Sequence, residues 1–69
     1  MKTLTREMLS QRIAALAAAS DALIAKKREF AVAVAAGDPA AKAEYAGLCE
    51  ATRQIEIEVE ALILAREAI

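Results

Sequence analysis

The stretch that most constrains the fold is AAGDPAAK, residues 35–42, because it holds the only proline of the chain and one of its two glycines. Gly37 suits the left-handed conformation that closes a helix. Asp38 suits the N-cap of a following helix, and Pro39 suits its first turn, where a missing N–H costs nothing. A helix stop and a helix start thus follow each other with almost no loop between them. Two helices joined so tightly must run antiparallel.

The composition on both sides of this break favours helices. Nineteen of the 69 residues are alanine, and the chain has one Phe, one Tyr and no Trp. We predict one all-α domain over residues 1–69, with helices at about 6–36 and about 39–68, a turn at 37–38, and Thr5 as the first N-cap. The segment QIEIEVEA, residues 54–61, alternates like a strand. We assign it to the second helix, because glutamate favours helices and no second strand exists to pair with it.

Large apolar residues recur in both halves at alternating spacings of four and three, which is typical of a coiled-coil-like seam. The seam of the first helix comprises Leu9, Ile13, Leu16, Ser20, Leu23, Lys27, Phe30 and Val34. The seam of the second comprises Ala41, Tyr45, Leu48, Thr52, Ile55, Val59, Leu62, Arg66 and Ile69. When the chain folds at the break, facing residues should have numbers that add to about 75. Ser20 and Thr52 should either bond their hydroxyls to the carbonyl four residues back or specify the register.

Several large apolar residues fall outside the seam: Ile24, Val32, Ile57, Ile63 and Leu64. A helix that is apolar on more than one side expects more than one neighbour. A chain of 69 residues folded as a thin hairpin also buries little apolar surface by itself. We therefore expect these five residues to form an oligomer interface, through which the hairpin dimerises into a four-helix bundle or a higher homo-oligomer. Another helical protein is an alternative partner.

The two halves differ in charge. Residues 1–36 carry six basic and three acidic side chains, a net of +3, and residues 37–69 carry three basic and seven acidic ones, a net of −4. Opposite signs favour pairing of the two helices and chiefly set their orientation. The single cysteine, Cys49, excludes an internal disulfide and fits a cytoplasmic location. Charges interrupt every long apolar stretch, so we expect no transmembrane span and no membrane partner.

Lys26, Lys27 and Arg28 form the only basic cluster. They would suit a patch that contacts nucleic-acid phosphates, but the net acidity of the chain favours a solvated face, with Lys27 extended across Tyr45. The overall plan resembles that of the Rop family, small hairpin dimers whose helix faces bind RNA; the resemblance is one of architecture and includes no shared motif. It implies an alternative in which the clusters of two copies line an RNA-binding groove. Small phage or prophage assembly components are a further alternative, since short alanine-rich hairpins are common among them.

The chain lacks the residue sets that catalysis requires. It has no histidine, no cysteine–base pair and no glycine-rich phosphate loop. Glu56, Glu58 and Glu60 are carboxylates near one another, but we interpret them as a solvated acidic face, because metal sites in helical bundles combine inward-facing Glu with His. We expect no catalytic residue, no cofactor and no metal. The predicted function is that of a non-catalytic structural or regulatory protein–protein interaction module that acts through self-association.

Overall fold

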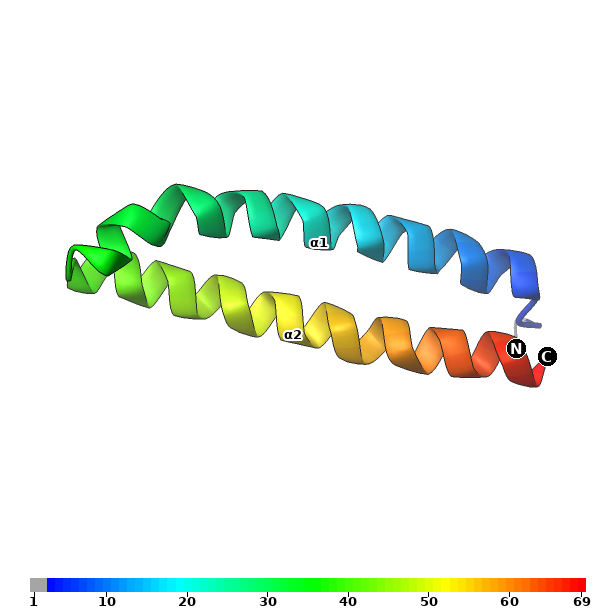
Figure 1. Cartoon of the computed structure of the whole chain (residues 1–69). Helices are drawn as coiled ribbons and strands as arrows, with labels where there is room; N and C mark the ends of the chain where they lie inside the picture. Colours follow the sequence, from blue (N-terminus) through cyan, green and yellow to red (C-terminus); the bar gives the residue numbers. More distant parts are fainter. Residues whose placement is uncertain (1–2) are drawn as a thin grey trace.

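In a computed structural model that describes residues 3–69, the chain forms two helices, α1 (Arg6–Ala35) and α2 (Pro39–Ala68). They pack side by side and antiparallel, so that the start of α1 and the end of α2 lie at the same end of the molecule (Figure 1). The molecule measures 49 × 19 × 14 Å along its principal axes. The predicted all-α antiparallel hairpin is confirmed, and residues 54–61 lie within α2.

The turn between the helices combines a C-terminal and an N-terminal cap. Gly37 has a φ of 89°, the left-handed conformation predicted for it. Its N–H donates to the carbonyl of Val34 and the N–H of Asp38 donates to that of Ala33, each at 3.0 Å, which is the Schellman pattern. The carboxylate of Asp38 then accepts hydrogen bonds from the first free N–H groups of α2, as an N-cap does. Ala36 is the C-cap of α1, so this helix ends one residue before the expected position.

The start of α1 also follows the sequence expectation. Thr5 has an extended conformation, and its hydroxyl oxygen accepts a hydrogen bond from the N–H of Met8 at 3.2 Å. This bond satisfies one of the donors that a helix start leaves free. Thr5 is thus confirmed as the N-cap.

The predicted seam faces the partner helix. All eight seam residues of α1 are buried or half-buried, and so are those of α2 except Ile69, which follows the end of α2 and is 55% exposed. Contacts between the helices join Arg12 to Glu58, Lys27 to Tyr45 and Arg66 to Ser10, so the paired numbers add to 70, 72 and 76. This agrees with the predicted register.

The core between the helices is thin. Among the described residues only Leu9, Leu16, Ala41 and Thr52 are buried, and no large side chain is completely enclosed. The hydroxyl of Thr52 donates to the carbonyl of Leu48 at 2.8 Å, which confirms the bond expected four residues back. A two-layer hairpin has only one inner surface, so each helix keeps most of its circumference exposed.

Candidate interaction surface

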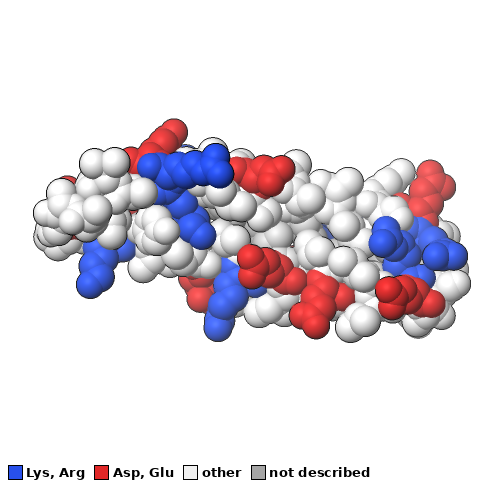
Figure 2. Space-filling model, viewed as in Figure 1, with Lys and Arg blue, Asp and Glu red and all other residues white. Residues whose placement is uncertain are grey.

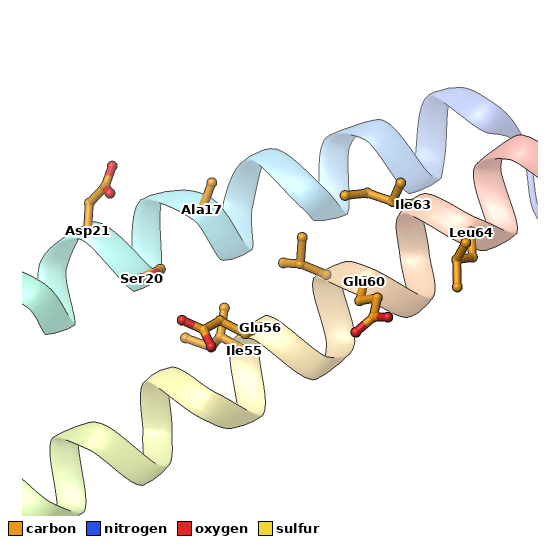
Figure 3. Close-up of a pocket in the computed structure, with 9 residues that line it drawn as sticks. Ala17, Ser20, Asp21, Ile55, Glu56, Glu60, Ile63 and Leu64 are labelled. Carbon is orange, nitrogen blue, oxygen red and sulfur yellow. The ribbon is translucent and has the colours of Figure 1, made fainter.

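A groove of about 460 Å³ runs between the helices in the half of the hairpin nearer the chain ends (Figure 3). From α1 it is lined by Ala17, Ser20 and Asp21. From α2 it is lined by Ile55, Glu56, Val59, Glu60, Ile63 and Leu64. The groove is therefore apolar along its length and carries carboxylates at its edges.

Small side chains on α1 produce the groove. Ala17 and Ser20 occupy the α1 wall, where a larger residue would fill the space beside Ile55 and Val59. Ile63 is half-buried and points from α2 toward α1, whereas Leu64 points away from α1 and is 58% exposed (Figure 3). The groove thus presents branched apolar side chains to solvent at a place where the helices themselves leave room.

The carboxylates at the edge stand free of partners. Asp21, Glu56 and Glu60 are all exposed, and within residues 3–69 none of them makes a hydrogen bond or an ion pair. Asp21 points outward from α1, on the far side from α2 (Figure 3). Three free acidic groups around an apolar groove suit an occupant that is apolar at its centre and basic at its rim.

The five residues predicted to form an oligomer interface do not share one side of the hairpin. Ile63 and Leu64 line the groove. Ile24 is 37% exposed and follows the lining residue Ala17 by seven residues, so it lies on the same side of α1 as Ala17. Val32 and Ile57 are 80% and 53% exposed and lie outside the lining. The helix period turns both of these toward the outer edges of the hairpin, and Ile57, seven residues before Leu64, lies on the same side of α2 as Leu64.

The basic cluster is divided by the helix. The ammonium group of Lys27 lies 5.8 Å from the centre of the Tyr45 ring, a cation–π contact within the seam, as expected for this residue. Lys26 and Arg28 are exposed. They are two positions apart, so they point ~200° apart around α1. The three residues therefore do not converge on one patch.

Other polar residues serve packing or remain solvated. The guanidinium of Arg12 donates to the carboxylate of Glu58 at 3.1 Å, and both side chains are about half exposed. Such a pair contributes only a few tenths of a kcal/mol to about 1 kcal/mol. Within residues 3–69 no cluster of three or more His, Cys, Asp or Glu is arranged to hold a metal ion. Cys49 is half-buried with a free thiol.

α1 contains a stretch that is long and apolar enough to cross a membrane. An 18-residue window within it has a mean hydropathy of 1.2, and 11% of that window is buried in the hairpin. Between Glu7 and Lys26 the only charges are Arg12 and Asp21, and seven of the residues are alanine. The buried core helix of a soluble protein and a signal sequence meet the same criteria of length and hydropathy.

No family model matches the sequence, and the chain matches neither a curated protein nor a solved structure. The residues that sequence reasoning did not single out are those of the α1 wall, Ala17 and Asp21. Their signal in the sequence is the run of small side chains from Ala17 to Ser20, opposite the branched residues of the second helix.

Proposed function

We propose that the protein is a non-catalytic interaction module in the cytoplasm that works by self-association, two hairpins forming a four-helix bundle with coiled-coil-like packing. The role of such a bundle is structural or regulatory, and its working surfaces are helix faces. Among the five off-seam residues of the predicted interface, Ile24, Ile57, Ile63 and Leu64 supply the apolar contact area, and Val32 lies at the outer edge of α1.

The observation that supports this proposal is the surface that a single hairpin leaves exposed. The accessible surface is 5138 Å². A compact monomer of 7.3 kDa exposes ~4,200 Å², so the hairpin exposes about 900 Å² more than its mass requires. A standard protein interface removes ~800 Å² from each partner. One interface per hairpin would therefore bring the exposed surface to the level of a compact protein.

The kind of surface exposed also supports association. Val32, Ile57 and Leu64 are each more than half exposed, and the groove adds branched apolar walls. Apolar patches of this kind on small proteins mark sites of contact with other proteins. The divided basic cluster, by contrast, offers no continuous track for a phosphate backbone, which favours the interaction module over the RNA-binding alternative.

Sedimentation equilibrium on the wild type and on an Ile57→Glu/Leu64→Glu variant tests the proposal. Both side chains are more than half exposed in the hairpin, so two charges there should spare the seam and prevent association. The matched control is Ala15→Glu/Ala22→Glu, which adds the same charge at the same spacing at two exposed positions of α1, on the side that carries Arg12 and Lys26. We expect a dimer for the wild type and the control and a monomer for the variant. A monomeric wild type would overturn the proposal.

A further inference from the structure

The groove lies on one of the two broad faces of the hairpin. Residues seven apart share a side of a helix that packs with four–three spacing. The lining residues therefore bring further side chains to their own side: Glu7, Ile24, Arg28, Lys42, Glu50, Arg53, Ile57 and Glu67. We call the lining residues and these eight together the groove face.

The charges of the groove face are sorted along the hairpin. Toward the turn the face is basic, with Arg28 and Lys42. Near the middle the signs are mixed, since Arg53 pairs with Glu50 at 3.5 Å and Asp21 lies close to the same level. Toward the chain ends it carries only carboxylates: Glu7, Glu56, Glu60 and Glu67. All nine charged side chains, Glu50 included, are exposed. Arg53 and Glu50 pair with each other, so the other seven charges are available to a partner.

Figure 2 shows mostly blue side chains over the part near the turn, with a red one at its upper edge, and red side chains that follow α2 from its middle toward its C-terminus. Blue and red are mixed at the far end of the hairpin. Arg6, in the first turn of α1, and the seam residue Arg66 reduce the acidic bias there without reversing it. The guanidinium of Arg66 donates a hydrogen bond to the hydroxyl of Ser10 at 3.2 Å. The opposite broad face has no such sorting, since Arg12 pairs there with Glu58. Lys26 and Glu44, whose numbers also add to 70, are at the same level along the hairpin.

The apolar features of the groove face are also displaced from its middle. Ile24 lies ~20 Å from the turn along the hairpin, and the groove occupies roughly 25 to 40 Å, counted at ~1.5 Å per residue. The hairpin is 49 Å long. A second hairpin turned end for end would therefore place its own Ile24 about 29 Å from the first turn, within the span of the groove.

We propose that two copies pack groove face to groove face with their turns at opposite ends, each inserting Ile24 into the groove of the other. This inference rests on the self-association proposed above and specifies its face and orientation. The basic half of each copy then covers the acidic half of the other. The carboxylates at the edge of one groove meet the basic side chains of the partner copy, Arg28, Lys42 and Arg53. With the turns at the same end, basic groups would meet basic groups near the turns and carboxylates would meet carboxylates near the chain ends, which is destabilising.

One pair of side chains tests this orientation sharply. Lys42 lies ~7 Å from the turn and Glu67 ~44 Å, so the end-for-end arrangement brings Lys42 level with the partner's Glu67 to within ~2 Å along the axis. Lys42 is in the first turns of α2 and Glu67 in its last. Exchanging their charges places an acidic group at the helix start and a basic group at its end, which favours the helix itself. A loss of association in these variants therefore cannot come from a weakened helix.

Sedimentation equilibrium should compare the wild type with Lys42→Glu, with Lys42→Glu/Glu67→Lys, and with Lys26→Glu. We expect Lys42→Glu to weaken dimerisation about tenfold, because the change occurs twice in a symmetric dimer, and the double variant to recover to within about threefold. The control Lys26→Glu makes the same change of charge at an exposed position on the opposite face, and its dimer should match the wild type.

A distance between two spin labels provides a second readout that does not depend on affinity. A single label at the turn, in an Ala36→Cys/Cys49→Ala variant, should give ~45 Å between copies when the turns lie at opposite ends. With the turns at the same end the distance should stay below ~30 Å, since each hairpin is only 19 × 14 Å in cross-section.

The outcomes separate this inference from the proposed function. A wild-type dimer with the expected charge rescue and the long distance supports both. A wild-type dimer in which Lys26→Glu weakens association as much as Lys42→Glu, or in which the labels are close, keeps self-association and overturns the groove-face arrangement. A monomeric wild type overturns both.

Discussion

The two glycines predict opposite effects for one and the same substitution. Gly37 has a φ of 89°, and a Cβ added there meets no atom within 4 Å. The cost of Gly37→Ala is therefore that of holding an L-residue in the left-handed region, ~1 to 2 kcal/mol of unfolding free energy. Gly47 lies inside α2, and a Cβ there also meets nothing within 4 Å. Gly47→Ala should stabilise the protein by ~1 kcal/mol, the difference in helix propensity.

Thermal unfolding followed by circular dichroism at 222 nm measures both effects. For a chain of this size 1 kcal/mol shifts Tm by about 4 to 8 °C. Gly37→Ala should lower Tm by roughly 5 to 15 °C, and Gly47→Ala should raise it by roughly 4 to 8 °C. Protein concentration must be the same in every melt, because association raises Tm by mass action. If both variants shift Tm in the same direction, the assignment of Gly37 to a left-handed cap is wrong.

Three further substitutions test the packing and the caps. Asp38→Ala removes the acceptor of two N–H groups and should lower the unfolding free energy by ~1 kcal/mol in urea titrations, whereas an unchanged midpoint would show that the α2 start does not need this cap. Leu16→Ala empties part of a thin core and should cost ~2 to 3 kcal/mol in the same assay; a cost below ~1 kcal/mol would contradict its burial. Arg12→Gln removes a half-exposed ion pair with Glu58 and should lower the unfolding free energy by at most ~0.5 kcal/mol in low salt and by less in ~1 M NaCl. A larger loss of unfolding free energy that persists in salt would contradict a solvated pair.

Much of the hairpin could be predicted from the sequence, because its determinants act over a few residues. Glycine favours the left-handed conformation at a helix end and aspartate favours the N-cap position. Gly37 and Asp38 adopt these conformations in the structure. The periodicity of the seam predicted which side of each helix is covered, and only Ile69, beyond the helix end, departs from it. The contact of Lys27 with Tyr45 followed from the same register.

The candidate surface was predictable only in part. The sequence pointed to off-seam apolar residues, but in one dimension Ile57 and Leu64 looked equivalent, and the structure places only Leu64 at the groove. Lys26 and Arg28 formed one cluster in the sequence, yet the turn of the helix separates them. Neighbours in sequence become neighbours in space only where the helix period allows it.

The sequence by itself determined that two helices form, where they stop and start, and which sides face each other, since caps and periodicity are local properties. Only the tertiary structure decided where the hairpin is hollow, because a groove depends on which side chains meet across the seam. Ala17 and Ser20 leave space only because Ile55 and Val59 stand beside them without filling it. That position also decides which broad face of the hairpin we propose as the interface, because sorted charges matter only on a face that a partner covers.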